Sequence, residues 1–304
     1  MAIMVVLCLC WGLNQVGIKI ANAGFSPIFQ AGLRSVGACI LLWLWMRWRG
    51  IPLFRRDGSL WVGILVGLLF AGEFLFLYWG LVHTGASRAV LFLYTAPFIV
   101  ALGVHFLVPG EQLRGLQVIG LLAAFGGVVL AFGDSLRLPS GEELYGDALC
   151  FIGAVFWGLS TVLVKASRLA LLSPSKTLLY QLVVSAVVLL AASAAIGEPG
   201  VTDPTLLMFA CLAYQIVVIA FISYLTWFWL ISRYPASRIS AFSFLTPLFG
   251  LAAGAILLAE PVTSLLLLAM LLVAAGIYLV NRRDAVLPAL AAVEVPLSGQ
   301  QQGP

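Results

Sequence analysis

Residues 11–19 of the chain read WGLNQVGIK, and residues 157–165 read WGLSTVLVK. A second pair of stretches repeats at nearly the same distance: residues 86–97 read ASRAVLFLYTAP, and residues 236–247 read ASRISAFSFLTP. The two offsets are 146 and 150 residues, close to half of the 304-residue chain. Self-similarity at a fixed offset predicts that one structural unit occurs twice.

Both copies lie in apolar stretches of membrane-spanning length. The chain is 62% hydrophobic and only 9% charged, with a mean hydropathy of +1.11, whereas a soluble domain is about a quarter charged. This composition excludes a soluble enzyme, a disulfide scaffold, a nucleic-acid binder and a disordered chain. A bilayer crossing takes about 20 residues, so ten crossings would use about 200. The predicted spans are 2–21, 27–46, 59–82, 86–108, 112–132, 144–168, 173–196, 205–232, 236–258 and 262–280.

The ends of the chain and its cysteines need separate interpretation. Span 2–21 lacks the basic first segment of a signal peptide, so we expect a retained first helix. The tail 284–304 is predicted to be a disordered cytoplasmic segment. The five cysteines lie in apolar stretches without the spacing of metal ligands, and neither a metal nor a cofactor is expected.

The basic residues predict the orientation, because Lys and Arg are retained on the cytoplasmic side. With the N-terminus inside, Arg88 and Arg137 fall outside. Lys19 and Arg34 lie within spans and are not counted. Twelve basic residues then lie inside: Arg47, Arg49, Arg55, Arg56, Arg114, Lys165, Arg168, Lys176, Arg233, Arg238, Arg282 and Arg283. Both termini are therefore expected in the cytoplasm, which requires an even number of helices.

The repeat and the charges together predict an inverted duplication. Glu111 with Gly127 corresponds to Glu260 with Gly276 at an offset of 149, so the units are expected at 1–133 and 134–283. Five spans per unit is an odd number, which makes the second unit enter from the opposite side. The fold class is thus an all-α polytopic membrane protein of ten transmembrane helices in two inverted five-helix repeats. Such duplication is typical of secondary transporters, whose site lies near the midplane.

These motifs resemble the EamA type of the drug/metabolite transporter superfamily. The resemblance rests on the Trp-Gly opening with a Lys eight residues later, the Pro-centred fourth helix and the Glu that opens the fifth, and it covers about residues 2–282. It implies a bacterial inner-membrane exporter of amino acids or related metabolites. The aromatic-rich third, fourth and eighth helices look most similar to YddG-type aromatic amino acid exporters. Arg34 departs from the pattern, because its counterpart lies near Ser185.

Two ionisable residues in or near the third span are candidates for function. Glu73 lies about midway along the span, where a charge costs roughly 2.5–3.5 kcal/mol on insertion scales. Helical spacing places His83 on the same stripe at the outer mouth. Glu73 could bind a substrate ammonium or titrate, and His83 could gate the mouth. Alternatively, Glu73 is a structural ion-pair or hydrogen-bond partner within the bundle, for which Arg34 is one candidate, and proton coupling is left open.

Other polar and aromatic residues are expected to line the cavity. Trp11 and Gln15 are four residues apart and share a helix face. Separately, Pro97 and Pro247 are predicted to kink their spans and to act as hinges. Lys19 and Lys165 of the repeated motif could extend to the two membrane interfaces rather than line the cavity. The predicted substrate-binding residues are Trp11, Asn14, Gln15, Glu73, Tyr78, His83, Tyr94, Trp157, Tyr214, Tyr224 and Ser243.

The predicted function is a secondary transporter that exports aromatic and other neutral amino acids by alternating access. Its expected partners are the small-molecule substrate and the lipid bilayer, without nucleic acid, and the chain is expected to be a monomer or a weak homo-oligomer. Export of another metabolite, such as a sugar, nucleotide-sugar or cationic drug, is the alternative. An intramembrane enzyme would need an activated nucleophile or a metal at depth, and a channel would not need the inverted duplication.

Overall fold

The computed structural model describes residues 2–52, 57–133, 138–258 and 264–282 of the chain, and every regular element in these ranges is a helix. An isolated antiparallel bridge joins Phe25 to Val201. The first half contains α1 (Ala2–Ala21), α2 (Pro27–Trp48), α3 (Leu60–His83), α4 (Ala86–Leu93), α5 (Ala96–Leu107) and α6 (Gly115–Phe132). The second half contains α7 (Gly141–Ala166), η2 (Arg168–Leu171), α8 (Pro174–Ile196), α9 (Leu206–Tyr214), η3 (Gln215–Ser223), α10 (Tyr224–Arg233), α11 (Ala236–Ala241), η4 (Phe242–Phe244), α12 (Leu245–Leu258) and α13 (Ser264–Asn281).

The helices follow the predicted spans closely. Within the described ranges, nine helical segments are long and apolar enough to cross a membrane, and the first has the predicted bounds. The apolar stretch Leu267–Asn281 of α13 is shorter and covers most of the predicted tenth span. A polytopic helical membrane protein is therefore confirmed, while the count of ten crossings stays a prediction. Arg55, Arg56, Arg137, Glu260, Arg283 and the tail lie outside the described residues.

Local sequence signals explain where several helices begin and end. Pro27 and Pro174 open α2 and α8, where the missing N–H of proline has no helical partner to lose. The Glu198 carboxylate accepts hydrogen bonds from the first backbone amides of α2, including Phe29 N at 2.8 Å. Gly197 ends α8 with a φ of +79°, a backbone conformation that favours glycine.

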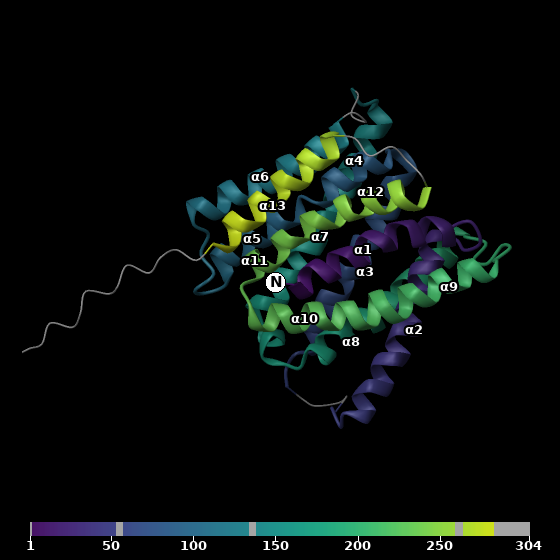
Figure 1. The fold of residues 1–304 in the computed structure, drawn as a ribbon. Coiled ribbons are helices and arrows are strands. Elements are labelled where there is room, and N and C mark those ends of the chain that lie inside the picture. Colours follow the sequence, from purple (N-terminus) through teal and green to yellow (C-terminus); the bar gives the residue numbers. More distant parts are fainter. Residues whose placement is uncertain (1, 53–56, 134–137, 259–263, 283–304) are drawn as a thin grey trace, which may run out of the picture.

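Helices of the first half pack against helices of the second half. The bundle pairs α1 with α12, α2 with α8, α3 with α7, α5 with α7, and α6 with α13 (Figure 1). A Cβ atom on Gly120 would stand 2.7 Å from the carbonyl oxygen of Gly276, and one on Gly127 would stand 2.8 Å from that of Ala269. The repeat offset of 149 residues relates Gly120 to Ala269 and Gly127 to Gly276. The contact of Gly120 with Gly276 therefore corresponds to the contact of Gly127 with Ala269.

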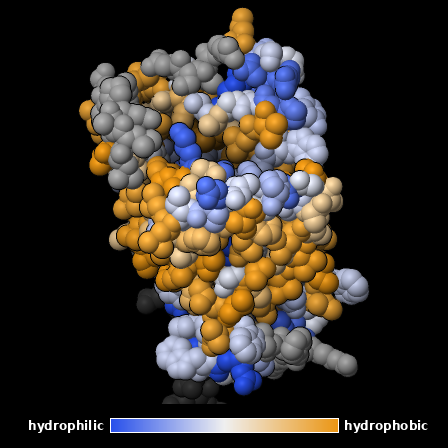
Figure 2. Space-filling model, turned by 90° about the vertical axis from the view of Figure 1, so that its right-hand side faces the viewer, coloured by the Kyte–Doolittle hydropathy of each residue, from blue (hydrophilic) through white to orange (hydrophobic). Residues whose placement is uncertain are grey.

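The surface of the bundle is largely apolar. Figure 2 shows a broad hydrophobic area on one face, with hydrophilic residues mostly above and below it. Many large apolar side chains are exposed, among them Trp61, Val82, Phe106 and Leu206. Because water would penalise such a surface, these side chains fit lipid contact, in agreement with a multi-pass membrane protein.

Two spans are interrupted next to the predicted prolines. In the fourth span, α4 ends at Leu93 and α5 begins at Ala96, so Pro97 is the second residue of the new helix. In the ninth span, the 3₁₀ turn η4 precedes α12, in which Pro247 is the third residue. Proline removes a backbone donor and disfavours helix in the residue before it, which explains both breaks. The helix assignment changes next to both prolines, and the kinks and their bending as hinges stay predictions.

Candidate substrate cavity

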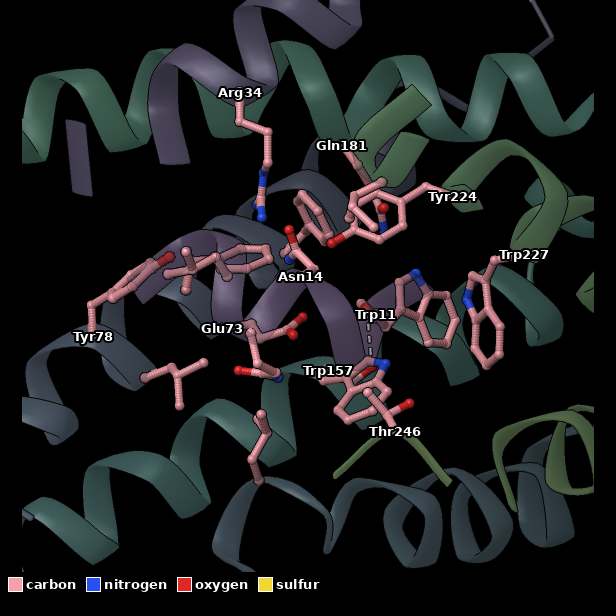
Figure 3. Close-up of a pocket in the computed structure, with 18 of the residues that line it drawn as sticks. Trp11, Asn14, Arg34, Glu73, Tyr78, Trp157, Gln181, Tyr224, Trp227 and Thr246 are labelled. Atoms are coloured by element: carbon pink, nitrogen blue, oxygen red, sulfur yellow. Dashed lines mark hydrogen bonds between the residues drawn. The ribbon is translucent and has the colours of Figure 1, made fainter. Parts of the chain in front are cut away.

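A cavity of about 190 Å³ lies inside the bundle between helices of both halves (Figure 3). A single water needs only about 10–15 Å³ of such space, so the cavity has room for a small metabolite. Its lining consists of Trp11, Asn14, Gln15, Ile18, Arg34, Phe70, Glu73, Phe74, Leu77, Tyr78, Leu81, Leu93, Tyr94, Trp157, Ser160, Thr161, Gln181, Ile219, Tyr224, Trp227 and Thr246. Eight of the predicted site residues are in this set: Trp11, Asn14, Gln15, Glu73, Tyr78, Tyr94, Trp157 and Tyr224.

Aromatic side chains form most of the walls and hold one another in place. The rings of Trp11 and Trp227 meet edge to face with centroids 5.6 Å apart, and those of Tyr94 and Trp157 do so at 5.9 Å. The Trp11 indole also donates a hydrogen bond of 2.8 Å to Ser223 Oγ. Edge-to-face pairs add stability beyond the area they bury. The walls are therefore positioned before a ligand enters.

Arg34 brings a positive charge into this apolar surrounding. Its side chain is 1% exposed, and its guanidinium carbon lies 4.3 Å from the centroid of the Phe74 ring. Arg34 Nε and Nη2 are buried and have no hydrogen-bond partner. Burying a charge without a partner is costly, because the interior does not replace the lost water. Arg34 is thus a cation that still lacks an anionic or acceptor group.

Glu73 contributes a carboxyl group to the cavity from α3. Among the described residues that line the cavity, Arg34 and Glu73 are the only ones of the types Arg, Lys, Asp and Glu. No ion pair within 4.0 Å joins Glu73 to Arg34, and no hydrogen bond to the Glu73 carboxylate occurs within the described ranges. The alternative that Glu73 is the direct structural partner of Arg34 is therefore not what the geometry shows. Figure 3 places the two side chains on different sides of the cavity, with Asn14 between them in this view.

Asn14 adds an unsatisfied acceptor to the same region. It is 7% exposed, and its side-chain oxygen Oδ1 has no hydrogen-bond partner. Gln181 and Thr246 reach the cavity from α8 and α12. Buried polar groups are normally hydrogen-bonded, so a group left open beside a cavity marks a place where water or a ligand can complete the bonding.

Three predicted site residues lie outside the cavity lining. His83 stands at the end of α3, where Nδ1 is 3.2 Å from Glu142 Oε1 and the ring packs against Tyr145. The Tyr214 hydroxyl donates to the Cys10 carbonyl oxygen at 3.0 Å, which ties α9 to α1. Ser243 is fully buried and donates to the Ser240 carbonyl oxygen at 2.6 Å. All three are occupied by contacts between or within helices.

The cavity also contains residues that the sequence analysis did not single out for binding. Phe70 and Phe74 lie in an apolar span, and no local sequence signal distinguishes them from the other apolar residues of that span. Gln181 carried a signal, since an amide within an apolar span needs a partner. Arg34 was noticed as an intramembrane charge, yet its lack of a direct partner could not be deduced without the packing.

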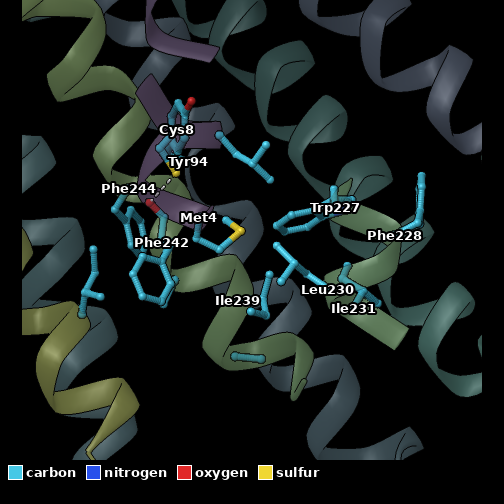
Figure 4. Close-up of a cluster of buried hydrophobic side chains, with 14 of the residues drawn as sticks. Met4, Cys8, Tyr94, Trp227, Phe228, Leu230, Ile231, Ile239, Phe242 and Phe244 are labelled. Carbon is cyan, nitrogen blue, oxygen red and sulfur yellow. Dashed lines mark hydrogen bonds between the residues drawn. The ribbon is translucent and has the colours of Figure 1, made fainter. Parts of the chain in front are cut away.

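The end of the bundle where α1 begins and α13 ends is hereafter called the terminal side (Figure 1). Between Trp227 and the terminal side, a cluster of buried side chains from α1, α10, α11 and η4 fills the space (Figure 4). These side chains close the cavity on the terminal side. Met4 is 1% exposed, and Cys8 donates through Sγ to the Phe242 carbonyl oxygen at 3.1 Å. Toward the other side, the lining continues as far as Ile18 and Leu81.

Ion pairs connect the helices at both ends of the bundle. On the terminal side, Lys165 Nζ lies 3.0 Å from Glu111 Oε1 and donates to two backbone carbonyl oxygens at the end of α10. On the other side, Asp147 pairs with Arg88 and accepts a hydrogen bond of 2.7 Å from Thr84 Oγ1. Within the described residues, no group of three His, Cys, Asp or Glu side chains could hold a metal ion.

The profile of the EamA-like transporter family matches residues 1–133 and 144–282, which is most of the chain. The chain belongs to the EamA-like transporter family. This membership indicates a transporter rather than an enzyme, in agreement with the resemblance drawn from the repeated motifs.

Full-length relatives support the assignment. This EamA-like transporter is 28% identical over 291 residues to a "Probable amino-acid metabolite efflux pump" of Escherichia coli, covering 92% of this chain and 93% of the relative. It is 22% identical to the "Uncharacterized transporter YoaV" of Bacillus subtilis, covering 89% and 92%. A solved crystal structure has the same fold, with a TM-score of 0.80 at 19% identity, covering 92% of this chain and 95% of that one.

Proposed function

We propose that this EamA-like transporter exports aromatic and other neutral amino acids across the bacterial inner membrane. The observation that carries the proposal is the cavity, where aromatic walls surround two opposite charges that are not paired with each other. Indole and phenol rings suit an apolar or aromatic side chain, and the charges suit a polar end group. The name of the Escherichia coli relative points to the same class of substrate.

The two halves act as inverted repeats of five helices each, at 1–133 and 134–283, with both termini in the cytoplasm. The matching contacts of Gly120 with Gly276 and of Gly127 with Ala269 support this arrangement, because an axis that exchanges α6 and α13 exchanges the two contacts. The excess of basic residues on the terminal side supports the orientation. Fusing a reporter that is active only in the cytoplasm to the C-terminus tests it.

Transport proceeds by alternating access around the cavity. With the termini inside, the closed terminal side is the cytoplasmic side, and the cavity faces outward. Opening inward requires the buried cluster around Met4 and Phe242 to separate, while helices on the outer side come together. The breaks before Pro97 and Pro247 lie at equivalent places in the two halves, so each half has a weak point at which it can bend.

Counterflow in proteoliposomes tests the proposed substrate. Vesicles preloaded with unlabelled L-tryptophan should accumulate radiolabelled L-tryptophan, and unlabelled phenylalanine or leucine outside should compete with the label. Protein-free vesicles are the control. A panel of amino acids that produces no exchange would refute the proposal, and exchange of a sugar or a cationic drug instead would favour the alternative substrate class.

A further inference from the structure

We infer that Arg34 binds the α-carboxylate of the substrate and Glu73 binds its α-ammonium, so that the cavity selects compounds that carry both groups. This inference rests on the proposed function and deepens it, because it names the residues that recognise an amino acid as a zwitterion. It also states which compounds the cavity should reject.

Two nitrogen atoms of the Arg34 guanidinium have no hydrogen-bond partner. A guanidinium presents its N–H groups in a fixed planar fork that matches the two oxygens of a carboxylate. Arg34 lines the cavity, stacks on Phe74, and leaves Nε and Nη2 without acceptors. Stacking on the ring holds the plane of the guanidinium but satisfies none of its N–H groups. A carboxylate that enters the cavity supplies the acceptors that the protein lacks.

Arg34 and Glu73 are not paired with each other. If the protein used Glu73 to neutralise Arg34, the two groups would form an ion pair, yet they are more than 4.0 Å apart. Attraction between opposite charges is strong where water is scarce, so the surrounding packing must hold them apart. A zwitterion placed between them neutralises each charge locally and leaves the total charge of the cavity unchanged. A simple anion or cation pairs with one residue and leaves the other unpaired.

The tryptophan side chains of the cavity lie to one side of Arg34 and Glu73. Figure 3 shows Trp11, Trp157 and Trp227 to the right of Arg34, Asn14 and Glu73. An amino acid whose charged end lies between Arg34 and Glu73 can direct its side chain toward the indoles. The Asn14 oxygen Oδ1, which has no partner, is available as a second acceptor for the ammonium.

Competition against L-tryptophan counterflow by the wild-type protein tests the inference without any variant. Tryptamine lacks the carboxylate and indole-3-propionate lacks the ammonium, while both keep the indole. Each lost hydrogen bond to a charged group is worth about a factor of ten or more, so both compounds should inhibit at least about tenfold less well than L-tryptophan. Equal inhibition by either compound would overturn the inference while leaving the proposed function intact. Absence of tryptophan exchange would instead refute the proposed function.

Charge-removing variants assign the two groups to their residues. Arg34→Gln should raise the KM for L-tryptophan about tenfold or more and abolish the preference for L-tryptophan over tryptamine. Glu73→Gln should raise KM similarly and abolish the preference over indole-3-propionate. Arg34→Lys keeps the positive charge but lacks the planar fork of N–H groups. Its KM for L-tryptophan should lie between those of the wild type and Arg34→Gln. Arg49→Gln, an exposed residue on the terminal side, is the matched control, and the opposite pattern of lost preferences would reverse the assignment.

Discussion

Lys165 Nζ and Glu111 Oε1 lie 3.0 Å apart, and this ion pair joins the end of α7 to the segment between α5 and α6. The other carboxylate oxygen, Glu111 Oε2, accepts a 2.7 Å hydrogen bond from the backbone amide of Ala236, at the start of α11. Two segments of the second half are thus held to one carboxylate of the first half. Both side chains are mostly buried, at 14% and 9% exposure, so the pair is shielded from competing water.

Removing the negative charge of this pair should loosen the terminal side. Breaking one member of a buried ion pair costs up to about 3–5 kcal/mol, and Glu111→Gln leaves Lys165 without its counter-ion. In a variant with Cys8 as its only cysteine, maleimide labelling of Cys8, which is now fully buried, should become faster. Glu142→Gln is the control, because it removes the exposed pair with His83 at the other end. Unchanged labelling of Cys8 in Glu111→Gln would mean that the pair does not hold this side closed.

Neighbouring glycines of α6 should respond differently to the same substitution. A Cβ atom on Gly127 would stand 2.7 Å from Val273 Cγ2 and 2.8 Å from the Ala269 carbonyl oxygen, whereas one on Gly126 would meet only Leu272 Cδ2 at 3.9 Å. Overpacking of a close contact costs about 1–3 kcal/mol, and glycine itself weakens a helix by about 1 kcal/mol. Gly127→Ala should therefore lower the Tm in detergent, and Gly126→Ala should leave it unchanged or raise it. Equal effects would contradict close packing of α6 on α13.

Hydropathy alone predicts where the helices lie, because bilayer crossing is a local property of the sequence. The predicted span 2–21 coincides with α1, and Pro97 places the break of the fourth span within a few residues. The π-helix η3 contains neither proline nor glycine, and no local sequence signal predicts it. Its nine residues lie against α1 and α2, contacts that a local sequence pattern does not specify.

The residues of the candidate site can be predicted from the sequence only in part. Glu73 and Trp11 stand out because a charge at depth and a repeated tryptophan are visible in the sequence. The position of Arg34 relative to Glu73 depends on how α2 and α3 are turned toward the cavity, which one sequence does not encode locally. For the same reason Tyr214 looked suitable for binding, although its hydroxyl is used by the Cys10 carbonyl.

Acid should destabilise the loop that precedes α3. The Asp57 carboxylate pairs with Lys176 and accepts from Ser59, and these bonds hold the pKa of Asp57 well below its ordinary value. A carboxylate with a lowered folded-state pKa contributes stability above its unfolded pKa, about 3.9, and this contribution is lost as the pH falls through the folded-state pKa. The Tm difference between wild type and Asp57→Asn should be constant above about pH 5 and shrink below about pH 4. A difference independent of pH would show that the charge of Asp57 is not responsible.

The indole of Trp157 should matter for large substrates more than for small ones. Its ring packs edge to face against Tyr94 on the cavity wall, and an aromatic pair of this kind contributes about 0.5–1.5 kcal/mol beyond its buried area. A substrate indole that meets the Trp157 ring gains a contact of the same kind, so Trp157→Ala should raise the KM for L-tryptophan by about two- to tenfold, while the KM for L-alanine changes less. Trp48→Ala is the control, because Trp48 is 76% exposed on the surface of α2. If the KM values for L-tryptophan and L-alanine rise equally in Trp157→Ala, the ring supports the cavity as a whole rather than the substrate side chain.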